Sequence, residues 1–293
     1  MSARAVLVIP ALNEEATIGG VVREAREHFA GPIVVADNGS DDGTAEVARA
    51  AGARVASEPV RGYGRACMAG ARAAGAADVL VFMDGDGSDR PADIAALLGA
   101  IEAGADLAIG VRRGADVEPG SMTGAARFGN WLSGVLLGAR YGRRLHDLSP
   151  LKAVRRPFLD GLRHDELTYG WTVELLARSL AVGGRVAEVD VGYRRRAGGT
   201  SKVSGDLRAS TRAGARILAT LWRVAVWERR REWAGAGLGL VVAAAVLVLV
   251  ASWLMADDSS GPRALVAVWL LAWPTLLVGV LSGWAVGQLW HRM

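Results

Sequence analysis

The stretch VLVFMDGDGSD, residues 79–89, joins an apolar run to a loop that carries acidic side chains. Residues 79–83 are all apolar, which is typical of a buried strand. Asp84 and Asp86 follow at once, so two carboxylates stand where the chain leaves the predicted sheet. Carboxylate oxygens are ligands that Mg²⁺ and Mn²⁺ prefer in proteins, and the intervening glycines allow a tight turn. The stretch therefore predicts a divalent metal site at a strand end.

Two other interpretations fit an acidic loop of this kind. A calcium-binding EF-hand loop also begins with D-x-D-x-S, but it requires glycine at its sixth position and glutamate at its twelfth. Those positions hold Asp89 and Ala95, which excludes it. The second interpretation is a solvated turn whose acids only cap the next helix. The motifs elsewhere in the chain decide between that turn and a metal site.

Strand-like and helix-like segments alternate on both sides of this loop. The predicted strands are residues 5–9, 33–36, 54–56, 79–83 and 106–110, and the predicted helices are residues 17–28, 44–51, 65–74 and 91–103. Such alternation predicts an α/β fold with a mostly parallel sheet and helices on both faces. Ligands of such sheets bind at the carboxyl ends of the strands. We therefore expect function in residues 10–15, 37–43, 84–90 and 110–113.

Two long apolar segments lie near the C-terminus. Residues 234–256 and 264–290 contain no ionisable side chain, and each is long enough to cross a bilayer as a helix. The polar residues 257–263 separate them, so the pattern predicts a C-terminal two-helix transmembrane hairpin. Two buried helices of a soluble core are the alternative, although soluble helices usually keep a polar stripe.

Positive charge flanks the predicted hairpin. Residues 206–232 contain seven arginines and three acids, interspersed with apolar side chains. Such a segment predicts a basic amphipathic helix in the headgroup layer of membrane lipid, with an ordinary surface helix as the alternative. The positive-inside rule then places the preceding residues on the cytoplasmic side. The predicted organisation is a catalytic domain over residues 1–204, an interfacial region over residues 205–233 and a membrane anchor over residues 234–293.

Composition excludes several classes of protein. Of 293 residues, 51% are hydrophobic and 22% are charged, which is too apolar for a disordered chain. The one cysteine, Cys67, cannot form a disulfide within the chain. The net charge of +4 arises in the basic segment before the hairpin, and no nucleic-acid motif accompanies it. The excess charge therefore indicates a membrane surface rather than nucleic acid.

Three motifs, each after its expected strand, carry a family resemblance. Residues 8–15 read VIPALNEE, residues 34–44 read VVADNGSDDGT, and residues 84–86 read DGD. Together they resemble the family 2 glycosyltransferases of the GT-A fold. The later segments RFGN at residues 127–130 and GTSK at residues 199–202, with Arg112 and Asp147, resemble the subgroup of dolichol-phosphate mannosyltransferase and the bacterial polyprenyl-phosphate glycosyltransferases. The resemblance covers residues 5–220.

The resemblance implies roles for particular residues. It places the nucleotide-sugar donor at Pro10, Ala11, Asn13, Glu14, Asp37 and Asp84, with Asp37 on the base. It implies a Mg²⁺ or Mn²⁺ ion at Asp84, Asp86 and Ser88. The catalytic set that it implies is Asp86, Arg112, Arg127, Asp147 and Lys202, of which the arginines bind the lipid phosphate. Arginine suits this task because its planar fork matches phosphate oxygens.

Several positions keep two interpretations. Asp147 is either catalytic or structural, and residues 146–152 depart from the Ser-Gly-Phe-Arg pattern of the subgroup. The basic run at residues 194–196 is either a solvated face or a contact for a headgroup or diphosphate. Glycines in residues 61–65 either face a phosphate or form a plain turn. Glu174, in a helix that we expect to begin near residue 171, either orients the acceptor or serves only the helix.

The activity implied is metal-dependent, inverting transfer of a hexose from a GDP- or UDP-linked donor to a polyprenyl phosphate at the membrane. A phosphate monoester is already anionic at neutral pH, so this acceptor needs no general base. The alternative is a family 2 enzyme with a hydroxyl acceptor, for which the hairpin is only a tether. A sugar-1-phosphate nucleotidyltransferase and a non-catalytic scaffold fit less well. The sugar, the base and the oligomeric state stay open.

Overall fold

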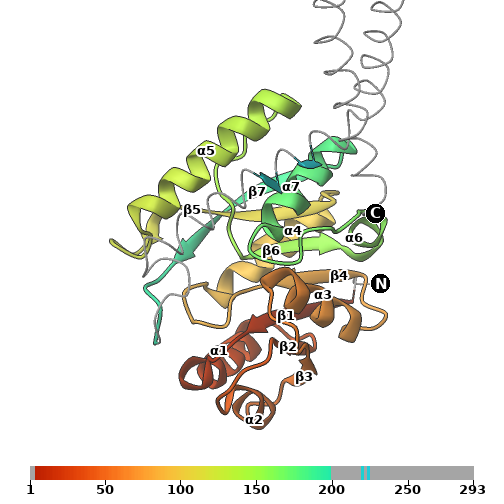
Figure 1. Cartoon of the computed structure of the whole chain (residues 1–293). Helices are drawn as coiled ribbons and strands as arrows, with labels where there is room; N and C mark the ends of the chain where they lie inside the picture. The colour runs from red at the N-terminus through yellow and green to blue at the C-terminus, as the bar shows by residue number, and fades with distance from the viewer. Residues whose placement is uncertain (1–3, 199–218, 221–222, 225–293) are drawn as a thin grey trace, which may run out of the picture. The chain divides into compact units, whose positions relative to one another are not determined.

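A seven-stranded sheet organises the protein in a computed structural model that describes residues 4–198, 219–220 and 223–224 (Figure 1). The strands are β1 (Ala5–Ala11), β2 (Ile33–Asp37), β3 (Arg54–Ser57), β4 (Val79–Phe82), β5 (Leu107–Val117), β6 (Lys152–Arg155) and β7 (Val186–Tyr193). They lie in the order β3-β2-β1-β4-β6-β5-β7. The five strands predicted from sequence all form, and β5 runs seven residues beyond its predicted end at residue 110.

The sheet is mixed. Strands β1 to β4 pair in parallel, as expected, and β5 pairs in parallel with β7. Strand β6 lies between β4 and β5 and is antiparallel to both. The expectation of a mostly parallel sheet therefore needs this correction in the second half of the domain. Strand β6 was missed because it has only four residues and carries Lys152 and Arg155 at its ends, so it lacks a strand's apolar pattern.

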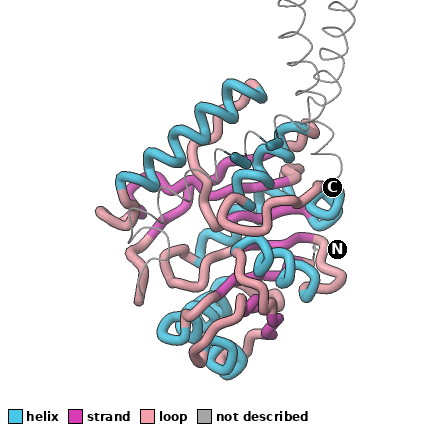
Figure 2. Tube along the Cα trace, in the orientation of Figure 1, coloured by secondary structure: helices cyan, strands magenta, loops and turns pink. Residues whose placement is uncertain are grey.

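Helices cover both faces of the sheet, as the alternating pattern predicts (Figures 1 and 2). They are α1 (Glu15–His28), α2 (Thr44–Ala50), α3 (Tyr63–Ala73), α4 (Ile94–Glu102), α5 (Gly124–Tyr141), α6 (Arg156–Gly161) and α7 (Trp171–Ala181), and the short 3₁₀ turn η1 (Pro91–Asp93) precedes α4. Because β1 is buried on both sides, its side chains enter two layers alternately. Leu7 and Ile9 pack with α1 and α4, whereas Val6 and Val8 pack with α3 and α7.

Helix α3 approaches β1 closely at Gly70. A Cβ atom at this position would lie 2.2 Å from Val8 Cγ1, in a fully buried layer. We expect Gly70→Ala to lower the free energy of unfolding by about 1–3 kcal/mol, because the layer has no room for the added methyl group. Chemical denaturation measures this change. Gly99→Ala on α4 is the control, since a Cβ atom added there would meet no other atom within 4 Å and the change should not destabilise the domain.

The chain divides into two compact units, residues 1–224 and 225–293. The predicted hairpin, Lys202 and nearly all of the predicted interfacial region lie outside the described residues. Within residues 4–198 and the short described pieces that follow, no helix has both the length and the apolar character required to cross a bilayer. The hairpin therefore stays a prediction.

Candidate active site

The carboxyl ends of β2, β1 and β4 bring the three sequence motifs to one edge of the sheet. These strands are neighbours and run in parallel, so the loops that follow them meet. The Thr17 hydroxyl donates to the Gly85 carbonyl over 2.9 Å, which ties the start of α1 to the acidic loop. The Asn38 amide donates to the Ala11 carbonyl over 2.8 Å, which ties the loop after β2 to the end of β1.

Hydrogen bonds fix the loop that follows β1. Asn13 has a positive φ of 51°, a conformation that asparagine tolerates better than most residues. Its amide donates to Ser40 Oγ, and its side-chain oxygen accepts from the Asp41 amide, both over 2.9 Å. Asp37 is buried at the end of β2, and its Oδ1 accepts from the Ser40 amide over 3.3 Å. The loops that carry the predicted nucleotide contacts are therefore held against each other.

Most of the acidic loop after β4 is buried: Asp86, Ser88 and Asp89 are buried, and Asp84 is partly exposed. Ser88 donates to Asp86 Oδ1 from its amide over 2.9 Å and from its hydroxyl over 2.5 Å. Burial, and then the charge of Asp86, raises the pKa of Asp84 to about 6. Burial, and then the charge of Asp84, raises the pKa of Asp89 to about 8. The loop thus places three carboxyl groups close together in largely buried surroundings, which disfavour their charged forms.

Arg196 supplies a positive charge to this loop. Its Nη2 lies 2.8 Å from Asp86 Oδ2, and its Nη1 lies 3.6 Å from Glu14 Oε1. The segment after β7 is held along the loop, because the Arg194 amide donates to the Ser88 carbonyl and the Ala197 amide donates to the Asp86 carbonyl. From the sequence, residues 194–196 could be either a solvated face or a contact for an anion. The tertiary structure places Arg196 against the predicted metal ligand Asp86.

The chemistry of these donors fits a divalent cation. Asp84 and Asp86 are carboxylates on one tight loop, and burial, followed by the charge of Asp86, raises the pKa of Asp84, an effect that a bound cation would offset. Among the described residues, no three His, Cys, Asp or Glu side chains are grouped to hold a metal alone. Magnesium sites are commonly completed by phosphate and water, so such a pair suits a site shared with a diphosphate. The Ser88 hydroxyl is directed at Asp86.

Arg112 and Asp147 form a second charged centre. Arg112 lies in β5, and its Nε and Nη2 donate to the two Asp147 oxygens over 2.9 and 2.6 Å. The same carboxylate accepts from the Arg112 amide, from Asn130 Nδ2 on α5 and from the Leu148 amide. Although burial opposes it, hydrogen bonding to Asp147 raises the pKa of Arg112 above its usual range. Asp147 therefore orients Arg112, and its oxygens are occupied.

Tyr193 joins the two centres. Its backbone bridges to Asp89 of the acidic loop, and Arg112 Cζ lies 4.7 Å from the centre of its ring. Arg127 is exposed on α5, three residues before Asn130, and residues at this spacing share a helix face. The fold thus brings together Arg112, Asp147 and the donor motifs, with Arg127 on the helix that contacts Asp147.

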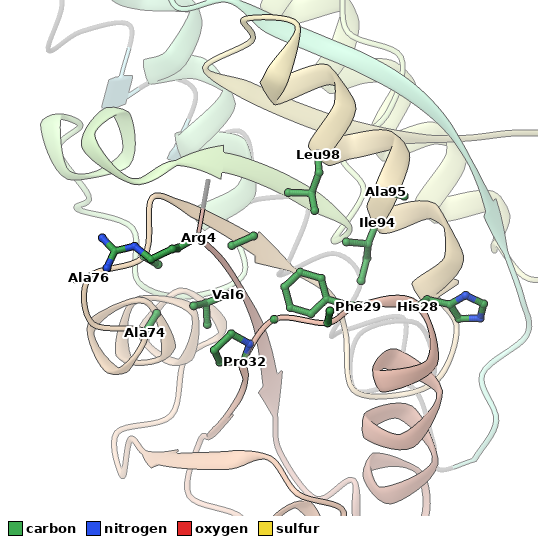
Figure 3. A pocket seen from close by; sticks show the side chains of 14 residues that line it. Arg4, Val6, His28, Phe29, Pro32, Ala74, Ala76, Ile94, Ala95 and Leu98 are labelled. Atoms are coloured by element: carbon green, nitrogen blue, oxygen red, sulfur yellow. The ribbon is translucent and has the colours of Figure 1, made fainter. Parts of the chain in front are cut away.

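A separate cavity lies at the other end of the sheet (Figure 3). It has a volume of about 690 Å³ and is lined by the start of β1, the end of α1 and the start of α4, including Val6, Phe29 and Leu98. Its lining is mainly apolar and includes no carboxylate. This cavity is unsuited to a metal–diphosphate complex, so we place the active site at the carboxyl ends of the strands.

The fold is of the GT-A kind found in nucleotide-sugar transferases. It is similar to glucosyl-3-phosphoglycerate synthase of Mycobacterium tuberculosis in complex with Mn²⁺, UDP and phosphoglyceric acid, with a TM-score of 0.62 and 29% identity over 76% of this chain and 78% of that one. The profile of glycosyl transferase family 2 matches residues 6–161. The chain belongs to this family and is a glycosyltransferase.

Two relatives indicate where in the family it falls. An uncharacterized glycosyltransferase of Mycobacterium tuberculosis is 39% identical over 70% of this chain and 91% of its own length. The polyprenol monophosphomannose synthase of Mycolicibacterium smegmatis is 33% identical over 78% of this chain and 88% of its own. The resemblance to the polyprenyl-phosphate subgroup, drawn from the motifs, is confirmed.

Proposed function

We propose that this protein transfers a hexose from a nucleoside diphosphate sugar to a polyprenyl phosphate at the cytoplasmic face of a membrane. The observation that carries the proposal is the pair of charged centres joined by Tyr193: an acidic loop suited to a metal–diphosphate, and an arginine held by a buried carboxylate. The similarity to a polyprenol monophosphomannose synthase supports the acceptor. A similar structure that contains Mn²⁺ and UDP supports the metal and the donor.

The donor side uses Asp84 and Asp86. A divalent ion held there would offset the charge that develops on the departing nucleoside diphosphate. Asp86 is paired with Arg196, so a metal ion held by Asp86 would compete with Arg196 for that carboxylate. A displaced guanidinium near two phosphates would pair with them, since arginine binds phosphate well. We therefore assign Arg196 to the donor diphosphate, with Asn13, Glu14 and Asp37 in the loops that surround the nucleotide.

The acceptor side uses Arg112. Asp147 takes its Nε and Nη2, so an acceptor phosphate would be held through Nη1. Arg127 adds a second positive charge from α5, and Lys202, outside the described residues, is a further candidate. Asp147 is engaged by five donors and is therefore a positioning residue, which agrees with an acceptor that needs no general base.

Helix α5 presents an apolar surface beside Arg127. Phe128 and Trp131 are 60% and 51% exposed, and their ring centres lie 5.8 Å apart. Exposed aromatic pairs next to cationic side chains suit the boundary between headgroups and acyl chains. We expect this pair to contact the membrane or the polyprenyl chain of the acceptor.

Replacing both rings should weaken use of the lipid acceptor. We expect Phe128→Ser with Trp131→Ser to raise the KM for polyprenyl phosphate in vesicles by about tenfold or more, because buried aromatic area is lost. Affinity for the nucleoside diphosphate should not change. Val182→Ser, at an exposed apolar residue after α7, is the matched control. An unchanged KM in the double variant would show that α5 is not part of the acceptor site.

A transfer assay with washed membranes tests the proposed function. Radiolabelled GDP-mannose and UDP-glucose are supplied in turn with Mn²⁺ and polyprenyl phosphate, and the lipid is extracted. Label in a lipid that mild acid hydrolyses supports a sugar phosphodiester. Label in an acid-stable glycolipid, or transfer only to a soluble acceptor such as phosphoglyceric acid, would show a hydroxyl acceptor and contradict the proposal.

A further inference from the structure

Lys152 is a buried cation beneath the acidic loop. Lys152 lies in β6 and pairs with Phe82 of β4, and Phe82 precedes Asp84 by two residues. The Lys152 side chain is completely inaccessible to solvent. Its ammonium donates to Thr172 Oγ1 of α7 over 3.1 Å. It also lies 5.2 Å from the centre of the Trp171 ring and 5.9 Å from that of Tyr63.

This positive charge is only partly compensated. No carboxylate in the described part of the chain forms an ion pair with it, and one hydroxyl is its hydrogen-bond partner there. Burying a lysine in this way is costly, and an apolar residue of similar volume would fill the space at less cost. Burial lowers the pKa of Lys152, while its electrostatic interactions with Cys67, Asp84 and Asp89 oppose that shift. Lys152 therefore carries a cost that packing alone does not explain.

The surroundings are polar and incompletely satisfied. Among the described residues, Trp171 Nε1 and Asp89 Oδ1 are buried without a hydrogen-bond partner. Burial and the charge of Asp86 raise the pKa of Asp84, the first residue of the predicted metal pair, and Lys152 acts in the opposite direction and lowers it. A charge fixed in this interior acts over several ångströms, because the effective permittivity there is far below that of water.

We infer that Lys152 is a positioning residue that acts through Asp84 and sets the order in which the site fills. Its fixed positive charge repels a metal ion that arrives alone and attracts a nucleoside diphosphate. The acidic pair therefore stays free of metal until the donor brings its negative charge. The inference rests on the proposed donor site at Asp84 and Asp86, and it concerns the binding of ligands before any transfer.

The test uses the full-length protein in detergent micelles and measures binding without turnover. Isothermal titration gives the Kd of Mn²⁺ alone and the Kd of UDP or GDP alone, for the wild type and for Lys152→Met. We expect the variant to bind Mn²⁺ about tenfold more tightly and the metal-free nucleoside diphosphate about tenfold more weakly. The loss of a positive charge should change the two Kd values in opposite directions, whereas a distorted site would bind both ligands more weakly.

Two further variants separate charge from packing. Thr172→Val removes the hydrogen-bond partner but keeps the charge, so the Kd of Mn²⁺ should stay within about twofold of the wild type. Lys152→Gln is a second neutral variant, measured in the same way if Lys152→Met does not fold, and it should show the same opposite signs. If the neutral variants bound both ligands equally more weakly, or if their Kd for Mn²⁺ were unchanged, this inference would be wrong, while the proposed function would still stand. A wild type that binds no nucleoside diphosphate with or without Mn²⁺ would overturn the proposed function as well.

Discussion

Asp86→Asn should reduce sugar transfer by at least about 10²–10³-fold, since electrostatic stabilisation of the leaving group is a dominant contribution to catalysis of this kind. The change keeps the size of the side chain and an oxygen for Ser88, but it removes the charge that would hold the metal ion. It also removes the negative charge of the closer of the two carboxylates that face Arg196, the other being Glu14. Both effects act on the donor, so the Kd of the nucleoside diphosphate in the presence of Mn²⁺ should rise while that without metal changes little.

The measurements are initial rates with a radiolabelled donor and a thermal-shift titration with nucleoside diphosphate and Mn²⁺, because a ligand that binds only the folded state raises apparent stability. Asp160→Asn is the matched control. That carboxylate lies on α6, is half exposed and pairs with Arg156, so its loss should leave transfer unchanged. If Asp86→Asn kept a tenth or more of the wild-type rate, the acidic loop would not be the metal–diphosphate site.

Arg112→Lys should lower kcat/KM for the lipid acceptor by about 10²-fold, because an ammonium cannot pair with Asp147 through two bonds and also hold a phosphate. The Arg112 side chain is 9% exposed and its guanidinium lies over the Tyr193 ring, so a lysine would lose both the orientation and this packing. Donor affinity should be nearly unaffected, because the acidic loop remains intact. The loss should therefore appear in KM for polyprenyl phosphate and in kcat, and not in the Kd of the nucleoside diphosphate.

Arg113→Lys provides the comparison within the same strand. Arg113 is exposed and pairs with Asp190, an interaction that contributes little to stability or to the site. Asp147→Asn should reproduce the defect of Arg112→Lys without altering the shape of the pH–rate profile. If Asp147→Asn instead removed a basic limb from that profile, Asp147 would be a general base and the acceptor would be a hydroxyl group.

The first half of the domain was largely predictable, whereas in the second half only β5 and the start of α7 were predicted. Predicted strands over residues 5–9, 33–36 and 79–83 match β1, β2 and β4 within a few residues. Their continuous apolar runs are characteristic of parallel strands that are buried on both faces. Strand β7 carries acids within its span, with the burial pattern of a partly exposed strand, and helix α5 has two large aromatic rings in solvent. Such elements lack the periodicity that reveals core-facing segments.

The candidate site divides in the same way. Motifs adjacent in sequence to strand ends, such as Asp84 and Asp86, could be assigned because a parallel sheet gathers the carboxyl ends of its strands. The contact of Arg112 with Asp147 spans 35 residues, and that of Arg196 with Asp86 spans 110, so neither follows from local spacing. The resemblance indicated that Arg112 and Asp147 matter, but not that the carboxylate holds the guanidinium.

The amino-acid sequence alone determined the α/β class, the family and the loops in which we place the chemistry, because these depend on hydropathy and on motifs a few residues long. The tertiary structure alone decided that Asp147 orients Arg112, that Arg196 faces the acidic pair and that Lys152 lies buried below it. Charged side chains have no periodicity of their own. The role of a charged side chain depends on the opposite charges near it and on how far it is shielded from water. Both are determined by the packing of the folded chain.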